Sequence, residues 1–442
     1  MTPRPPHSLN TGWHFPTPAL ARLDNGLAVW DYHLPGQYVA TATLVIDLPL
    51  TAEPPLIEGV AGLAARGVDE GTLEHPGLAY AALLEGRGAQ YSGWVGSSAS
   101  IAQVEVPAQW FADGLSAFAE GVMAPAYDEA DVARLVANRL AELDQLRAAS
   151  GRLASWLIRE TVLDPDQRAA RLVGGSHATA AAITADAVTA FHAAHWAPAQ
   201  SVLIVAGDLG PLDVAEAADA AFGAWSVQAA PAAHEPIRPA GPRRRLVHRP
   251  GAVQADIRLG WPDSVDASDP LYPAFQVAAT AMGGGFSSRL NQSLREDKGW
   301  TYDVSLRNHI FRRGGYVTVS TSTRTALAGD VIAEALRLTD LGPAGFTQEE
   351  IDEAVGFLVG VAPLSFSTAD AVAGHAADGA AHGQDHLAAD RFLQATAQVT
   401  PDQATEAWHS VMSRREPSLV VLGDADALAG PLGLEPEPIP EL

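Results

Sequence analysis

The stretch ITADAVTAFHAAHWAPAQSVLIVAGDLG, residues 183–210, returns later in the chain as VTPDQATEAWHSVMSRREPSLVVLGDADA, residues 399–427. The corresponding positions are Thr184 and Thr400, Phe191-His192 and Trp408-His409, and Gly207-Asp208 and Gly423-Asp424. Each copy predicts a helix that follows a threonine N-cap, and then a β-branched strand that ends in Gly-Asp. The sequence therefore contains one structural unit written twice.

The order of the other predicted elements agrees with this duplication. Each half begins with predicted strands, continues with helices and further strands, and ends in helices before its Gly-Asp strand. We expect an α+β fold of two homologous domains, each an antiparallel sheet packed with helices on one side. The first domain is predicted at residues 1–228 and the second at 251–430, joined by a Pro-rich linker at 229–250 and followed by a disordered acidic tail at 431–442.

The composition excludes several classes of function. The net charge is −24, with acidic residues spread along the chain, which argues against nucleic acid as a partner. The basic cluster RRRLVHR, residues 243–249, is predicted to be a solvated edge of the linker. The chain has no cysteine, no apolar run long enough to span a membrane and no secretion-signal pattern, so we expect a cytoplasmic protein without disulfides.

Two further stretches carry the functional signals. They are GVAGLAARGVDEGT, residues 59–72, and GGGFSSRLNQSLREDKGWTYDVSL, residues 283–306. Together with the duplication, they resemble the pitrilysin/insulinase family of zinc peptidases (inverzincins), particularly its mitochondrial-processing-peptidase-like members. The resemblance runs from about Leu23 to about Leu428, and it implies that the two domains form half of a clamshell-shaped peptidase.

The first stretch lacks the zinc site of an active member of this family. There, a helix carries His-x-x-Glu-His, whose histidines bind zinc and whose glutamate is the general base. Counting back from the Gly-Thr that ends the stretch places Gly62 and Arg66 at the histidine positions and Ala65 at the glutamate, while the family's third ligand falls on Glu142. One carboxylate cannot hold a catalytic zinc, so we expect no metal or other cofactor in this chain. We expect Glu142 to pair with Arg66 or to be solvated.

The second stretch keeps the family's Arg-Glu-x-x-Gly-x-x-Tyr, with Arg295 and Tyr302. The resemblance implies that this pair reaches across a closed chamber to the zinc site of another chain, where it binds the substrate carbonyl and stabilises the oxyanion. Guanidinium and phenol are both donors that need no prior deprotonation. Because processing-peptidase-like relatives contact substrate with a glycine-rich loop at this point, Gly283, Gly284 and Gly285 are further candidates for substrate binding.

Three functions are compatible with these residues. The leading hypothesis is a non-catalytic subunit of a heterodimeric zinc metallopeptidase, inactive alone, whose homologous partner has an intact His-x-x-Glu-His with its zinc and acts on peptides. The alternative is a structural scaffold with the same fold and no role in peptidolysis. The third is a stand-alone enzyme that uses His382 and His386, spaced i and i+4, although Gly379 and Gly383 weaken that helix. We interpret His192, opposite His409 in the repeat, as a helix-packing residue.

Overall fold

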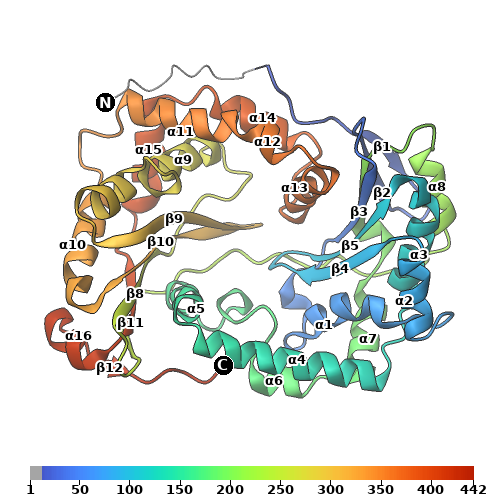
Figure 1. The fold of residues 1–442 in the computed structure, drawn as a ribbon, viewed down its shortest axis with the longest axis horizontal. Coiled ribbons are helices and arrows are strands. Elements are labelled where there is room, and N and C mark those ends of the chain that lie inside the picture. Colours follow the sequence, from blue (N-terminus) through green and yellow to red (C-terminus); the bar gives the residue numbers. More distant parts are fainter. Residues whose placement is uncertain (1–11) are drawn as a thin grey trace.

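The computed structural model describes residues 12–442, which form two α+β halves around two six-stranded sheets (Figure 1). The first sheet contains β1 (Ala19–Arg22), β2 (Ala28–His33), β3 (Val39–Ile46), β4 (Gln90–Val95), β5 (Ser100–Pro107) and β6 (Ser201–Gly207). The second contains β7 (Arg244–His248), β8 (Gln254–Trp261), β9 (Thr301–Phe311), β10 (Gly314–Arg324), β11 (Ser418–Gly423) and β12 (Pro436–Glu437). Residues 1–11, where the sequence analysis found no secretion-signal pattern, lie outside the described part of the chain.

Five strands of each sheet have the same topology, which confirms the predicted α+β fold of two homologous domains; only the outermost strands differ, because β1 is antiparallel to β2 and β12 is parallel to β7. Their spatial orders are β1-β2-β6-β3-β5-β4 and β12-β7-β11-β8-β10-β9. In each, the strand that ends the repeat, β6 or β11, is parallel to one neighbour and antiparallel to the other. Each sheet is therefore mixed rather than antiparallel throughout, because β6 and β11 return to their sheets through long helical crossovers.

The aspartate of the Gly-Asp that closes each repeat accepts a backbone hydrogen bond at an equivalent turn in both halves. Asp208 Oδ2 accepts a hydrogen bond from the backbone N–H of Gly36 at 2.7 Å, and Asp424 Oδ2 accepts one from Gly251 at 3.2 Å. Each aspartate thus secures the turn between the first two long strands of its own half. Both N-cap threonines also accept hydrogen bonds from the first turn of their helices.

Helices make up most of the remaining chain. Those of the first half are α1 (Val60–Arg66), α2 (Leu78–Glu85), α3 (Phe111–Met123), α4 (Glu129–Ala148), α5 (Ser150–Val162), α6 (His177–Ala181), α7 (Ala185–His195) and α8 (Val214–Phe222). Those of the second are α9 (Tyr272–Ala279), the π-helical turns η7 (Thr280–Gly284) and η8 (Asn291–Asp297), α10 (Ala328–Thr339), α11 (Gln348–Gly360), α12 (Ala362–Ser365), α13 (Ala369–Ala381), α14 (Ala388–Thr396), α15 (Pro401–Met412) and α16 (Ala425–Leu432). Within residues 12–442, none of the helices is long and apolar enough to cross a membrane.

Each half lends one helix to the sheet of the other half (Figure 1). Helix α5 buries Leu157 and Ile158 against Val420 of β11, and α13 buries Val372 against Val45 of β3. The opposite face of each sheet packs on helices of its own half. The expectation of helices on only one side of each sheet is therefore wrong, and the two domains are joined by shared cores.

The predicted linker at residues 229–250 is shorter than expected, because its end forms β7 of the second sheet. The basic cluster at 243–249 is only partly a solvated edge: Arg243 and Arg244 are exposed, but the rest of the cluster is half-buried or buried. Arg245 binds Glu160 of α5 at 2.8 Å, and Arg249 donates to the carbonyl oxygen of Ala148 at 2.7 Å. These arginines connect the second sheet to the α4–α5 region of the first half.

The acidic tail at residues 431–442 is ordered, contrary to the prediction of disorder. Its strand β12 pairs with β7, and Glu437 Oε1 accepts a hydrogen bond from Arg245 Nε at 2.5 Å. Leu442 is only 6% exposed, and its carbonyl oxygen accepts a hydrogen bond from the backbone N–H of His177 at 2.8 Å. One carboxylate of the acidic tail, that of Glu437, is thus paired with a basic strand that is distant in the sequence.

Candidate functional site

The third zinc-ligand position, Glu142 on α4, is held by two arginines. Arg66 Nη1 of α1 donates to Glu142 Oε1 at 2.7 Å, and Arg139 Nη1 donates to Glu142 Oε2 at 3.2 Å. Burial alone would raise the pKa of Glu142, but the hydrogen bonds and charges of Arg66 and Arg139 outweigh it and leave that pKa below its ordinary value. The predicted pairing of Glu142 with Arg66 is confirmed.

The rest of α1 is packed and hydrogen-bonded without any metal ligand. Ala65 is fully buried, and its carbonyl oxygen accepts a hydrogen bond from Tyr91 Oη at 2.6 Å. Tyr127 Oη donates to the neighbouring carbonyl of Ala64 at 2.9 Å. A Cβ added at Gly62 would meet only Val95 Cγ2, at 3.6 Å. One carboxylate already bound to two guanidinium groups does not fit a catalytic zinc ion, which needs three protein ligands and an open position.

A buried ion pair holds the start of α1. Glu53 Oε1 accepts hydrogen bonds from the backbone N–H groups of Gly59 and Ala61, both at 3.0 Å, and Arg168 Nη2 donates to Glu53 Oε2 at 2.7 Å. The side chains of Arg168 and Glu53 are 5% and 0% exposed. Burial raises the pKa of Glu53, and Arg168 opposes this shift. The start of α1 is therefore fixed by a buried and fully hydrogen-bonded carboxylate.

Arg295 and Tyr302, the candidate pair of the second stretch, lie next to each other. Arg295 belongs to η8, and Lys298-Gly299 ends this helical segment, with Gly299 at a φ of 61°. Tyr302 follows in β9, and its side chain is 86% exposed. The guanidinium carbon of Arg295 lies 5.6 Å from the centroid of the Tyr302 ring.

Phe286 is a third member of this group, and the sequence analysis missed it. Its ring centroid lies 4.8 Å from the guanidinium carbon of Arg295, so Arg295 contacts the rings of both Phe286 and Tyr302. Phe286 is 70% exposed, which is unusual for so large an apolar side chain. The signal in the sequence was a phenylalanine between glycines and serines, nine residues before the arginine that it contacts.

The three candidate glycines have different surroundings. Gly283 is buried, and a Cβ there would come within 2.6 Å of Leu306 Cβ, so it serves close packing against β9 rather than substrate binding. Gly284 is exposed, and Gly285 lies beside an open groove of about 410 Å³. The groove is lined by Thr280, Ala281, Gly285, Phe286, Ser287, Ser288, Glu350, Glu353, Ala354, Gly356, Phe357 and Val361.

The histidines of the third hypothesis do not form a metal site. Helix α13 ends at Ala381, so His382 and His386 do not share a helix. His382 Nδ1 lies 2.8 Å from the carbonyl oxygen of Asp378, and the ring of His386 packs on Trp30. His192 is buried and hydrogen-bonds through Nε2 to the carbonyl oxygen of Val122 at 3.0 Å, as expected of a helix-packing residue.

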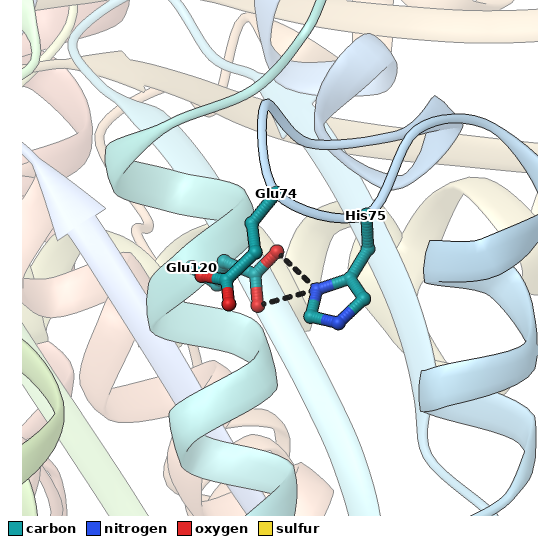
Figure 2. A group of neighbouring side chains, drawn as sticks. All are labelled: Glu74, His75 and Glu120. Carbon is teal, nitrogen blue, oxygen red and sulfur yellow. Dashed lines mark hydrogen bonds and ion pairs between the residues drawn. The ribbon is translucent and has the colours of Figure 1, made fainter.

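Two other groups of possible metal ligands occur among residues 12–442, and the sequence analysis identified neither. Figure 2 shows the first, in which His75 Nδ1 lies 2.8 and 3.1 Å from the two carboxylate oxygens of Glu120, with Glu74 beside them. Thr72 Oγ1 also donates to Glu120. The hydrogen bond that the imidazole of His75 donates to the carboxylate of Glu120 raises the pKa of His75. This group is therefore an ion pair that fastens the loop after α1 to α3.

The second group, His248, Asp424 and Asp426, belongs to the start of α16. Asp424 accepts hydrogen bonds from the backbone N–H groups of Gly251 and Asp426, and His248 Nδ1 accepts one from Ala425 at 3.0 Å. These side chains cap a helix and secure a turn. Their arrangement is explained without a metal ion.

Comparison with known proteins agrees with this geometry. A family model described as the peptidase M16 inactive domain matches residues 182–358, which include Arg295 and Tyr302. An uncharacterized zinc protease of Streptomyces coelicolor is 32% identical over 58% of this chain and 57% of its own length. A non-peptidase homolog, YmxG, of Helicobacter pylori is 30% identical over 26% of this chain and 27% of its own length. The match with the Streptomyces relative thus spans less than two thirds of that protein.

Solved structures show the same fold over nearly the whole chain. A peptidase M16 inactive domain from Pseudomonas fluorescens superimposes with a TM-score of 0.85 at 21% identity, covering 92% of this chain and 98% of that one. A protease from Helicobacter pylori superimposes with a TM-score of 0.81 at 16% identity, covering 93% of this chain and 100% of that one. Residues 182–358 therefore match the inactive domain of the peptidase M16 family, and nearly the whole chain shares the fold of a solved peptidase M16 inactive domain.

Proposed function

We propose that this chain is the non-catalytic subunit of a heterodimeric zinc peptidase, and that Arg295 and Tyr302 act on substrate bound to the partner. The observation that carries the proposal is the contrast between the two halves of the site. Arg66 and Glu142 neutralise each other where zinc would bind, whereas Tyr302 is exposed and next to Arg295. Arg295 is half-buried and lies 3.2 Å from Glu296 Oε1, but a purely structural chain has no need of an exposed phenol beside a guanidinium.

The chemistry of the pair fits the developing charge of peptide hydrolysis. Attack on a peptide carbonyl turns its oxygen into an oxyanion, and donors fixed in advance stabilise that charge. Tyr302 supplies one O–H donor and Arg295 supplies several N–H donors with a permanent positive charge. Contact with the rings of Phe286 and Tyr302 restricts the guanidinium of Arg295, which reduces the entropy lost when it binds the carbonyl.

The zinc and the general base would come from the partner. We infer a homologous chain with an intact His-x-x-Glu-His, because the side chains of α1 in this chain do not fit the metal. The substrates would be short or unfolded peptides that add as a strand to a sheet edge in the partner's first half. The groove beside Phe286 and Phe357 supports peptides with an apolar side chain near the bond that is cut.

The test is reconstitution of the two chains. This chain and a homologous chain with the intact motif, encoded in the same genome, are purified separately and mixed. We expect a stable heterodimer on size-exclusion chromatography, and turnover of a mixed peptide library by the heterodimer but not by either chain alone. A partner that cuts peptides equally well without this chain would contradict the proposal and support the scaffold alternative.

A further inference from the structure

The side chains at the start of strand β9 do not alternate regularly between its two faces. Val304 and Leu306 face the core under the helices of the second half. Side chains in a strand alternate between faces, so a regular strand would place Tyr302 on that same buried face. Instead Thr301 is buried and Tyr302 is 86% exposed.

A β-bulge causes this irregularity. In the pairing of β9 with β10, Val304 lies opposite Thr321, and Thr301 lies opposite Thr323. Two residues of β9, Tyr302 and Asp303, therefore face a single residue of β10. Such an extra residue turns the side chains around it and commonly lies beside functional sites.

Buried threonine hydroxyls surround the bulge. Thr321 Oγ1 donates to the carbonyl oxygen of Asp303 at 2.7 Å, and Thr301 Oγ1 lies 2.8 Å from the carbonyl oxygen of Ser322. The two hydroxyls are 2.7 Å apart, and both threonines are less than 9% exposed. Their two protons can therefore satisfy one carbonyl group on each strand of the bulge, Asp303 on β9 and Ser322 on β10.

We propose that Thr301 and Thr321 are positioning residues that hold this bulge and thereby turn Tyr302 out of the core toward substrate. The part that concerns substrate rests on the proposed function, whereas the part that concerns the exposure of Tyr302 does not. Valine at either position would keep the shape of the side chain but remove the hydroxyl. The carbonyl groups of Asp303 and Ser322 would then lose buried partners, and the regular register, with Tyr302 on the core face, would be favoured.

The test measures the exposure of Tyr302 directly in the isolated chain. Tyrosines are nitrated with tetranitromethane, and each site is quantified by mass spectrometry in the wild type, in Thr301→Val/Thr321→Val and in Thr301→Ser/Thr321→Ser. Two tyrosines serve as internal standards: Tyr38, which is 74% exposed, and Tyr80, which is 0% exposed. The single variant Thr321→Val and its serine counterpart are measured in parallel, because they disturb the fold less.

We expect Tyr302 to react like Tyr38 in the wild type and in the serine variants, and to lose most of its reactivity relative to Tyr38 in the valine variants. Tyr80 should stay unreactive throughout. An unchanged ratio of Tyr302 to Tyr38 in the valine variants would overturn the proposal. So would reactivity of Tyr80 in every valine variant, because the hydroxyls would then support the fold in general.

Turnover of the reconstituted heterodimer separates this proposal from the proposed function. If the valine variants lower both the nitration of Tyr302 and kcat, and the serine variants restore both, the threonines position a working donor. If nitration falls while kcat stays unchanged, the threonines still position Tyr302, and the role of Tyr302 in catalysis is what fails.

Discussion

Arg66 Nη1 donates to Glu142 Oε1 at 2.7 Å, from α1 to α4, between two positions at which an active relative would bind zinc. Glu142 also accepts a hydrogen bond from Arg139, so the carboxylate is compensated twice. Arg66, at one of these positions, is thus bound to the carboxylate of Glu142, at the other.

The first prediction concerns metal content. We expect the purified chain to hold no stoichiometric zinc, because Gly62 and Arg66 offer no ligand atom and Glu142 is engaged. Elemental analysis after dialysis against buffer with micromolar zinc measures this. Glu142→Gln and His75→Gln serve as controls, since they show whether any residual zinc binds near α1 or at the surface group of Figure 2. One tight zinc ion per chain that is lost in Glu142→Gln would contradict the account.

The second prediction concerns the buried ion pair beneath α1. Arg168→Ala leaves the carboxylate of Glu53 buried without its countercharge, so the free energy of unfolding should fall by about 3–5 kcal/mol. Arg171→Ala is the matched control, because Arg171 is partly exposed. Its partner Glu58 would also retain a second cation, since Arg168 Nε lies 3.7 Å from Glu58 Oε1. Urea unfolding of the three proteins measures the difference. Equal losses of unfolding free energy in the two variants would show that the buried pair contributes no more to stability than the partly exposed pair.

The third prediction concerns acid stability. Burial lowers the pKa of His192 to about 4, while the hydrogen bond to Val122 opposes the shift only in part. Between pH 6.5 and 4 the unfolded chain binds a proton at this residue and the folded chain does not, so stability must fall as the pH falls through this window. Across this window the lowered pKa of His192 reduces the free energy of unfolding by about 3 kcal/mol. His192→Gln keeps a donor for Val122, and its urea midpoint should depend less on pH; identical pH profiles for both proteins would contradict the assignment.

The fourth prediction concerns Phe286. Removing its ring frees one face of Arg295, and a cation–π contact at an exposed site is worth about 0.5–1 kcal/mol, so kcat/KM of the heterodimer should fall by roughly two- to fivefold. Phe286→Leu keeps an apolar wall for the groove but no ring, and should behave like Phe286→Ala. Phe357→Ala changes the groove without touching Arg295 and should affect only peptides with a large apolar side chain. Full activity of Phe286→Leu would remove Phe286 from the site.

The sequence predicted the features that are local or repeated. The threonine caps and the Gly-Asp ends of the repeat predicted two equivalent halves. In the structure, Asp208 and Asp424 hold equivalent turns. Arg295 and Tyr302 were identified within one short motif, and the structure places their side chains beside each other. The threonine caps and the Arg295 motif lie within short stretches of sequence, whereas the hydrogen bonds of Asp208 and Asp424 join segments 172 and 173 residues apart and were found only in the structure.

The features that escaped prediction depend on contacts between distant segments. No local pattern indicates that α5 and α13 are exchanged between the halves, or that Glu437 meets Arg245. The bulge that exposes Tyr302 depends on hydroxyl groups contributed by two strands. Phe286 was missed because an exposed phenylalanine acquires a role only through the arginine that folds against it.

Turnover by the reconstituted heterodimer with Tyr302→Phe in this chain tests the central claim most directly. The substitution keeps the ring near Arg295 and removes only the hydroxyl, so assembly and melting temperature should stay unchanged while kcat falls about 10²–10³-fold. Arg295→Ala should cost at least as much and also raise KM, because the guanidinium can contact the carbonyl of the bound substrate. Tyr38→Phe, at another exposed tyrosine, should have no effect. An unchanged kcat in both Tyr302→Phe and Arg295→Ala would contradict the account and make this chain a scaffold.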